Sequence, residues 1–424
     1  MPPPIRFPRL EDWLEWQQSA HPRAIDLGLE RVARVLRRTG WSTPAQPVIT
    51  VGGTNGKGSC VALLESILRA GGYRVGSFTS PHLLDYRERI QLDGAWASAA
   101  SLVAAFERIA DALDGDSLTF FEHGTLAALL VFETWRPDVM LLEVGMGGRL
   151  DAVNVVDPDV AVVVSVGPDH MEWLGPDVES IGREKAGIFR RARPAICGMR
   201  DPPRSVREVA TAVGAQLRVR GRDFDGRERP DGGWDYADAD GSLDALPRPA
   251  LVGVEQVGNS ATALAAVRAL QSRLPLGRDA VERGLRAVRL PGRFQRIAAT
   301  EGFEWVLDVA HNPAAAATLA ANLARHRVRG RTIAVCGMLE DKDVAGVLGP
   351  LRDRVDCWLA AATQTARGLS DTDLVTRAAA AGVAMTAAGT VPEAMRRAAG
   401  LARDGDRVLV FGSFHTVGPA LACV

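Results

Sequence analysis

The stretch Gly52-Gly-Thr-Asn-Gly-Lys-Gly-Ser59 contains the residue types that a phosphate-binding loop needs. Glycines allow backbone N–H groups to face a phosphate, Lys57 supplies a full positive charge, and Ser59 could ligate Mg²⁺. The general pattern has glycine where Val51 stands and Ser or Thr directly after the lysine, where Gly58 stands. An ordinary glycine-rich turn is therefore the alternative, but the position between a strand-like and a helix-like run favours nucleotide binding.

Polar residues follow three further strand-like runs. Ser80-Pro81-His82 follows the run 73–78, Glu143 ends the run 138–143, and Asp169-His170 follows the run 160–166. Loops after parallel strands share one edge of a sheet, so Ser80, Glu143 and His170 could hold one or two divalent ions beside ATP. A Ser-Pro turn and a salt-bridged or helix-capping Glu143 are the alternatives.

Five more positions combine polar chemistry with a suggestive place in the chain. Asp308 and His311 follow a strand-like run, and Arg293 lies beside the hinge-like Leu290-Pro-Gly292, so these groups could reach nucleotide in an interdomain cleft. Lys185 lies in a helical run, where the default interpretation is a surface lysine. His123 lies on an apolar helix and is expected to be a core histidine with satisfied hydrogen bonds.

Short aliphatic runs alternate with helical patterns along most of the chain, which predicts an α/β fold with mainly parallel sheets. Strands are expected at 47–51, 73–78, 138–143, 160–166 and 194–197, and a hairpin at 233–246. The alternation restarts after the hinge. We therefore predict a domain 1–288 and a smaller α/β domain 289–424.

The composition narrows the class of protein. The 424 residues include 50 Lys plus Arg and 51 Asp plus Glu, and this balance argues against nucleic acid or an anionic membrane as a partner. Five cysteines without a C-x-x-C pair argue against a disulfide framework or a structural zinc site. The apolar runs fall far short of the ~20 residues that span a bilayer, so we expect a cytoplasmic protein.

Eight motifs together resemble the folylpolyglutamate synthases of the Mur ligase superfamily, and most closely their bifunctional bacterial branch. The family loop contains the same Gly-Lys-Gly insertion, and Asp12-Trp-Leu14 and Ala24-Ile-Asp-Leu-Gly-Leu-Glu-Arg31 extend the resemblance towards the N-terminus. The motifs stand in family order at Gly53-Thr-Asn-Gly-Lys-Gly58, Thr79-Ser-Pro-His82, Glu143-Val-Gly-Met-Gly-Gly-Arg-Leu-Asp151, Asp169-His170, Gly182-Arg-Glu-Lys-Ala-Gly-Ile188, Leu290-Pro-Gly-Arg-Phe294, Asp308-Val-Ala-His-Asn312 and Gly412-Ser-Phe-His415.

The resemblance implies a phosphate-loop ATPase domain followed by a Rossmann-like domain, and it implies roles for individual residues. Lys57, Lys185 and His170 are the implied catalytic residues, Lys185 as a carbamate, and Ser80, Glu143 and His170 are the implied Mg²⁺ ligands. The implied ATP contacts are Thr54, Asn55, Gly56, Lys57, Asn259, Arg293 and Asp308. The implied dihydropteroate contacts are Ala24, Ile25, Asp26, Leu27, Thr119, Phe120, Phe121, Glu122, Leu150, Asp151 and Ala152.

The implied reaction is ATP-dependent amide formation through an acyl phosphate. L-Glutamate would be joined to dihydropteroate and, in a second activity, to reduced folates, by a monomer that uses ATP, Mg²⁺ and in some members a monovalent cation. A monofunctional folylpolyglutamate synthase, a Mur-type peptidoglycan ligase and a phosphate-loop switch ATPase are the alternatives. Only about 45 residues precede the first strand, too few for the additional N-terminal domain of a peptidoglycan ligase.

Overall fold

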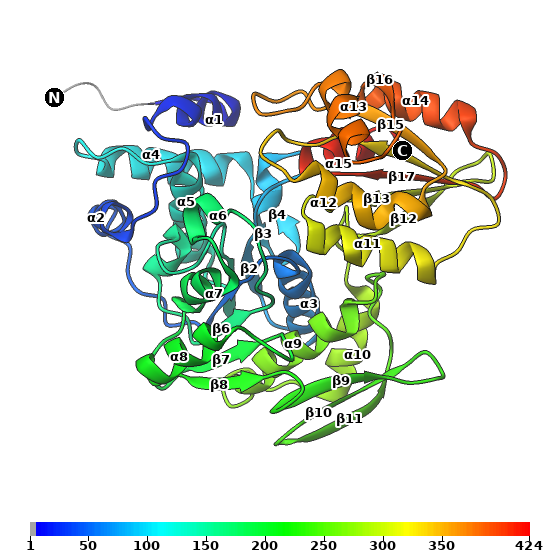
Figure 1. Ribbon diagram of the computed structural model, residues 1–424. Helices are drawn as coiled ribbons and strands as arrows, with labels where there is room; N and C mark the ends of the chain where they lie inside the picture. Colours follow the sequence, from blue (N-terminus) through cyan, green and yellow to red (C-terminus); the bar gives the residue numbers. More distant parts are fainter. Residues whose placement is uncertain (1–5) are drawn as a thin grey trace. The chain divides into compact units, whose positions relative to one another are not determined.

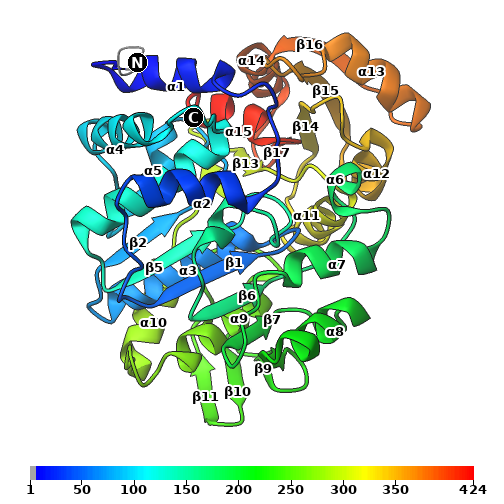
Figure 2. The same ribbon diagram turned by 90° about the vertical axis from the view of Figure 1, so that its left-hand side faces the viewer.

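The computed structural model describes residues 6–424, which form two compact units (Figures 1 and 2). The first unit contains the chain up to Pro81 together with Arg87–Pro249 and Val257–Val288. The second unit contains Arg289–Val424 and two short segments from earlier in the chain, His82–Tyr86 and Ala250–Gln256.

An eight-stranded sheet forms the centre of the first unit, in the order β4-β3-β2-β5-β1-β6-β7-β8. Along this order the strands β2, β5, β1, β6, β7 and β8 pair in parallel. Strands β3 and β4 form an antiparallel edge beside β2. Every residue of β1 and β5 is buried, as expected for apolar strands covered on both faces. The strands are β1 (Val48–Gly52), β2 (Val75–Phe78), β3 (Ile90–Leu92), β4 (Ala95–Trp96), β5 (Val139–Glu143), β6 (Val160–Val163), β7 (Pro194–Cys197) and β8 (Gln216–Val219).

Helices and a small second sheet complete the first unit. Helix α3 packs against β1, β2, β5 and α10, and helix α5 packs against α4 and β2. The antiparallel sheet has the order β11-β10-β9, with β9 (Phe224–Glu228), β10 (Trp234–Asp238) and β11 (Gly241–Leu246). The helices are α1 (Leu10–Ser19), α2 (Leu29–Arg38), α3 (Lys57–Ala70), α4 (Ala99–Ala112), α5 (Phe120–Trp135), α6 (Met171–Leu174), α7 (Val178–Ala186), α8 (Arg204–Val213), α9 (Gln256–Ala269) and α10 (Arg278–Ala287), with 3₁₀ helices η1 (Tyr86–Arg89) and η2 (Ala152–Val155).

The second unit is built on a six-stranded sheet in the order β12-β13-β17-β14-β15-β16. Strand β12 is antiparallel to β13, and the other pairs are parallel. Along β17, Leu409 and Phe411 enter one apolar cluster while Val408 and Val410 enter another, so helices cover both faces. The elements are β12 (Gln295–Ala298), β13 (Glu304–Asp308), α11 (Pro313–Arg325), β14 (Thr332–Cys336), α12 (Val344–Leu348), η3 (Gly349–Arg354), β15 (Cys357–Ala362), α13 (Asp371–Ala380), β16 (Thr386–Thr390), α14 (Val391–Leu401), β17 (Arg407–Phe411) and α15 (Phe414–Leu421).

The predicted α/β class, the mainly parallel sheets and the hairpin of β10 and β11 are confirmed. Two strand boundaries were wrong, because β2 begins at Val75 instead of Tyr73 and β6 ends at Val163, so that residues 164–166 belong to a loop. Within residues 6–424, no helix is both long enough and apolar enough to cross a membrane. The five cysteines are free; Cys60, Cys197 and Cys336 are buried, Cys357 is half-buried and Cys423 is exposed.

Candidate active site

The predicted phosphate loop connects β1 to the N-terminus of α3. Gly56 precedes the helix with a left-handed φ of 83°, and a Cβ there would come within 2.9 Å of Val164 Cγ1 and 3.2 Å of Asn259 Oδ1. Glycine is therefore required both by the backbone and by space. The same approach places Asn259, a predicted ATP contact on α9, directly against the loop.

The loop after β6 holds the phosphate loop from the side. Backbone N–H groups of Thr54 and Asn55 donate to the carbonyl and the hydroxyl of Ser165, at 2.8 and 2.9 Å. The Thr54 hydroxyl also donates to the Gly167 carbonyl at 3.1 Å. Lys57 Nζ donates to the Gly53 and Thr54 carbonyls at 3.0 and 3.3 Å, so the ammonium group lies at the loop itself.

Two of the three predicted Mg²⁺ ligands are in contact. Ser80 follows β2, Glu143 ends the neighbouring β5, and the Ser80 backbone N–H donates to Glu143 Oε2 at 3.3 Å. The Glu143 side chain is buried, and burial beside this carboxylate raises the pKa of Cys60 to about 12. Since β5 pairs with β1, the carboxylate lies on the sheet edge that bears the phosphate loop.

His170, the third predicted ligand, lies further from its strand than the sequence suggested, because β6 ends at Val163. It adopts a left-handed φ of 50° before α6, and its imidazole is 39% exposed, with Nε2 3.8 Å from Asp169 Oδ1. No group of three His, Cys, Asp or Glu side chains in residues 6–424 has metal-binding geometry by itself. The three predicted ligands offer one carboxylate, one hydroxyl and one imidazole, so Mg²⁺ at such a site would take its remaining ligands from phosphate oxygens and water.

Lys185 is buried, contrary to the default interpretation of a surface lysine. Its side chain is 4% exposed on α7. Burial, and next the positive charge of Lys57, lower the Lys185 pKa to about 7, while Asp169 and Asp151 act in the opposite direction. A substantial fraction of this amine is therefore neutral near pH 7, which makes it nucleophilic.

The glycine-rich loop after Glu143 lies against the helix that bears Lys185. A Cβ at Gly148 would lie 2.9 Å from the carbonyl oxygens of both Glu184 and Lys185, so only glycine allows this approach. Arg149 Nη2 pairs with Glu184 Oε1 at 2.8 Å, and the Arg149 N–H donates to the Glu184 carbonyl. The two sequence motifs thus form one structural feature.

The three segments predicted to bind dihydropteroate belong to elements that pack together, because α2 and α5 both contact η2. Ala24–Leu27 immediately precede α2, Thr119 caps α5, and Asp151 caps η2. Asp151 accepts hydrogen bonds from the N–H groups of Met146 and Val153, and its burial raises its pKa to about 6. The Phe121 ring lies over Gly145, where a Cβ would approach it within 2.6 Å.

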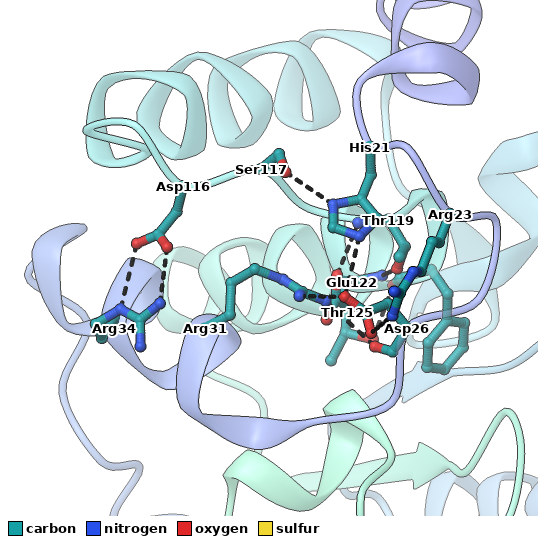
Figure 3. Close-up of polar contacts among 11 residues, drawn as sticks. His21, Arg23, Asp26, Arg31, Arg34, Asp116, Ser117, Thr119, Glu122 and Thr125 are labelled. Atoms are coloured by element: carbon teal, nitrogen blue, oxygen red, sulfur yellow. Dashed lines mark hydrogen bonds and ion pairs between the residues drawn. The ribbon is translucent and has the colours of Figure 1, made fainter.

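Arg31 and His21, to which the sequence analysis gave no role, connect two of these segments (Figure 3). Arg31 Nη1 donates to Asp26 Oδ2 and Nη2 donates to Glu122 Oε1, both at 2.6 Å. His21 Nε2 lies 3.1 Å from Asp26 Oδ2, and Nδ1 lies 2.8 Å from Ser117 Oγ. Arg31 is the last residue of the motif 24–31, but a solvent-exposed arginine on a helix would produce the same sequence pattern.

His123 is a core residue as predicted, but its hydrogen bonds are not satisfied. Neither ring nitrogen has a hydrogen-bond partner among the described residues, and the ring lies near Trp16 and Phe106. Burial lowers the His123 pKa to about 3, so the imidazole is neutral in the folded protein.

The remaining predicted nucleotide contacts belong to the second unit. Asp308 ends β13 and accepts hydrogen bonds from the N–H groups of Phe294 and Ala310, both at 2.8 Å. Burial raises the pKa of Asp308, and the charge of Arg293 opposes this shift. The Arg293 guanidinium lies 5.1 Å from the centre of the Phe414 ring, and the His311 ring lies 6.4 Å from the same ring.

Comparison with known proteins gives an independent result. Residues 51–217 match the Mur ligase middle domain, and residues 292–414 match the Mur ligase glutamate ligase domain. The dihydrofolate synthase/folylpolyglutamate synthase of Escherichia coli (strain K12) is 44% identical over 98% of this chain and 95% of the relative. The enzyme of the same name from Mycobacterium tuberculosis is 33% identical over 78% of this chain and 73% of the relative.

Solved structures agree with these relatives. Escherichia coli FolC in complex with DHPP and ADP superposes with a TM-score of 0.92 and 45% identity, covering 98% of this chain and 97% of that one. A bifunctional folylpolyglutamate synthase/dihydrofolate synthase with Mn, AMPPNP and L-glutamate bound gives a TM-score of 0.89 and 44% identity, covering 98% and 97%.

The phosphate loop, the buried lysine and the two matched domains place the chain among the Mur ligases. Within that class the chain belongs to the dihydrofolate synthase/folylpolyglutamate synthase family. It is thus an ATP-dependent ligase that adds glutamate to folates.

Proposed function

We propose that the chain catalyses two glutamate ligations, to 7,8-dihydropteroate and to tetrahydrofolates, through the same acyl-phosphate chemistry. The substrate carboxylate attacks the γ-phosphorus of ATP, and ADP leaves. The amine of L-glutamate then attacks the acyl carbon, loses a proton and displaces inorganic phosphate. The burial of Lys185 on α7, within electrostatic reach of Lys57, is the observation that best supports this mechanism over simple ATP hydrolysis.

The first step brings together two anions, so the protein must screen their charges. Lys57 lies at the phosphate loop, and Thr54, Asn55 and Gly56 of the same loop are proposed as further contacts with the ATP phosphates. Asn259 lies against the same loop and is proposed as a further nucleotide contact. Arg293 and Asp308, in the second unit, are proposed to complete the ATP site.

Ser80, Glu143 and His170 are proposed to hold Mg²⁺. Their hydroxyl, carboxylate and imidazole donors leave room for phosphate oxygens, as Mg²⁺ in nucleotide sites requires. When bound, the ion supplies positive charge to the transferring phosphoryl group. A relative with Mn and AMPPNP bound is consistent with a divalent ion at this kind of site.

Lys185 is proposed to function as a carbamate. Its neutral Nζ attacks the carbon of CO₂ and releases one proton, which converts a buried neutral amine into a buried anion. A pKa of about 7 makes the neutral amine available at physiological pH. Lys57 lies close enough to shift that pKa and would stabilise the negative product, which would supply an oxygen ligand for a second Mg²⁺.

The dihydropteroate site is proposed to lie where the segments 24–27, 119–122 and 150–152 come together. Phe120 and Phe121 offer half-buried aromatic surface for a flat ring, and Asp151 offers a buried carboxyl group. The pKa of Asp151, raised to about 6, would allow its carboxyl group to exchange a proton with a bound heterocycle. An Escherichia coli relative has been solved in complex with DHPP and ADP.

An isotope experiment tests the acyl phosphate. Dihydropteroate labelled with ¹⁸O in its carboxylate is incubated with ATP, Mg²⁺ and L-glutamate, and the released phosphate is analysed by mass spectrometry. One ¹⁸O per phosphate is expected for each amide formed. Unlabelled phosphate alongside product would exclude the intermediate, and ATP hydrolysis independent of both substrates would indicate a switch ATPase. The same experiment with labelled tetrahydrofolate tests the second activity.

A further inference from the structure

We propose that Arg31 is a positioning residue for dihydropteroate, holding the segment 24–27 and the first turn of α5 in one fixed arrangement. The proposal rests on the function proposed above, because those two segments are the predicted substrate contacts. Arg31 lies on α2 between them, and Figure 3 shows its guanidinium reaching one carboxylate from each.

The guanidinium group of Arg31 makes three hydrogen bonds to these two segments. Besides the two contacts at 2.6 Å, Nη2 donates to the Asp26 carbonyl oxygen at 3.2 Å. The Arg31 side chain is 19% exposed and that of Glu122 is 4% exposed, so solvent screens their ion pair only weakly. The hydrogen bond from Arg31 is the main factor that lowers the pKa of Asp26.

Glu122 already uses both carboxylate oxygens inside the protein. Oε1 accepts from Arg31, and Oε2 accepts from the Thr119 backbone N–H at 2.7 Å, while the Thr119 hydroxyl accepts from the Glu122 N–H. This capping box fixes the start of α5. We infer that Glu122 contributes to the site by positioning, and that Phe120 and Phe121 present the surface that contacts the ligand.

Arginine is suited to this position for a geometric reason. Its planar fork can donate to two carboxylates in different directions, whereas a lysine is a single point charge. Lysine at position 31 would pair with one carboxylate at a time. The other carboxylate would lose its counterion. For Glu122, which is buried, this would leave an unpaired buried charge, and the two segments would no longer be fixed to each other.

Arg34 provides a matched control on the same helix. Positions 31, 34 and 38 lie on one face of α2 because of the helical repeat. Arg34 donates to Asp116 at 2.8 Å, and Arg38 donates to Asp116 and to the Leu113 carbonyl. The Arg34 side chain is 44% exposed and pairs with Asp116 in the loop before Ser117. This ion pair involves neither substrate segment.

The test compares R31K with R34K in steady-state kinetics of the full chain. For R31K we expect the KM for dihydropteroate to rise between about tenfold and a hundredfold, since small misplacements of binding groups have effects of this size. The KM for ATP should change by less than about twofold, because the phosphate loop is not connected to Arg31. R34K should leave both values within about twofold of the wild type, whatever its melting temperature.

Hydrogen exchange provides a readout that does not depend on turnover. R31K should speed exchange both in residues 20–27 and in the first turn of α5, whereas R34K should affect only the loop at 113–117. A folded R31K protein with an unchanged KM for dihydropteroate would overturn the proposal, even if its melting temperature fell. If R31K does not fold, E122Q removes the other carboxylate charge that Arg31 pairs with and keeps the shape of the side chain; a similar rise of the KM for dihydropteroate is then expected, and an unchanged KM would overturn the proposal.

The two proposals fail in distinguishable ways. If wild-type protein showed no dihydropteroate-dependent ATP cleavage, the proposed function would be wrong and Arg31 would have no substrate to position. If wild-type protein were active and R31K kept the wild-type KM, only the role of Arg31 would be wrong.

Discussion

Replacement of Lys185 with methionine should stabilise the unliganded protein and, at the same time, abolish its ligase activity. The lysine is buried on α7, where desolvation disfavours its charged form and Lys57 adds repulsion. Methionine has a similar length and no charge to bury. The gain in stability should depend on pH in a way that follows from the lysine pKa.

The magnitude comes from the difference between the folded-state pKa, about 7, and the reference value of 10.5. Between these values the unfolded chain binds more protons, so the stability of the wild-type protein rises with pH. At about pH 7 the ionised unfolded lysine gives the unfolded state an advantage of roughly 4 kcal/mol, and at about pH 9.5 this falls to roughly 1 kcal/mol. The stability difference between K185M and wild type should therefore shrink by roughly 3 kcal/mol over this range.

The assay is native-state hydrogen exchange of the slowest amides in β1 and β5, which reports unfolding of the first unit. Wild type and K185M are compared at both pH values in buffers freed of CO₂, so that no carbamate forms. Any pH-independent effect of the methionine side chain cancels in the comparison. A stability difference that stays constant between the two pH values would refute a buried lysine with a lowered pKa.

The activity of the same variants tests the carbamate separately. K185M and K185A should lose most of their activity, and a short-chain carboxylate should partly restore it in K185A by occupying the place of the carbamate. K185R should also fail, because a guanidinium group does not form this carbamate and would repel Mg²⁺. Full activity of K185R would show that Lys185 serves as a cation or not at all.

Three further predictions follow from the site and the core. K57A should raise the activation free energy that corresponds to kcat/KM by about 3–4 kcal/mol while the fold stays intact. Near-normal kinetics would show that Lys57 is not part of the ATP site. E143Q keeps the shape of the side chain but should shift the Mg²⁺ titration of activity at least about tenfold upward; an unchanged titration would exclude Glu143 as a ligand. Between about pH 6.5 and pH 3, His123 is protonated in the unfolded chain but neutral in the folded protein, so it should cost the wild type roughly 2 kcal/mol of unfolding free energy between about pH 7.5 and pH 5 in urea unfolding, and H123L should lose less by about this amount; equal losses would contradict a buried neutral imidazole.

The sequence was sufficient where one residue type has one structural use. Continuous apolar runs predicted β1 and β5, because both faces of these strands are buried and their residues therefore need not alternate between apolar and polar. The glycines of the phosphate loop and the loop at 145–148 marked places where a Cβ would collide with the neighbouring backbone or side chains. Ser80 and Glu143 were predicted to share a sheet edge, and the structure brings them into contact.

The sequence was insufficient where a residue's role depends on a distant partner. Short edge strands such as β4 and β12 consist of partly exposed residues without a distinctive pattern. Arg31 is one of several arginines on α2, and only its contact with Glu122, 91 positions away, distinguishes it. Likewise, nothing in the local sequence of α7 separates a buried Lys185 from a surface lysine, because burial depends on distant segments that pack against α7, among them the loop with Gly148.

Several groups of this site are unfavourable for folding when considered alone, and that pattern is itself informative. Lys185 is buried with a pKa of about 7, and Asp151 is buried with a pKa of about 6. Burial of an ionisable group disfavours the folded state, so such groups persist where their chemistry is needed. Glu122 is also a buried carboxylate, but its charge is balanced by Arg31 within the protein. A buried carboxylate with its own arginine counterion maintains the shape of the site, which distinguishes it from Asp151, whose pKa is raised by burial.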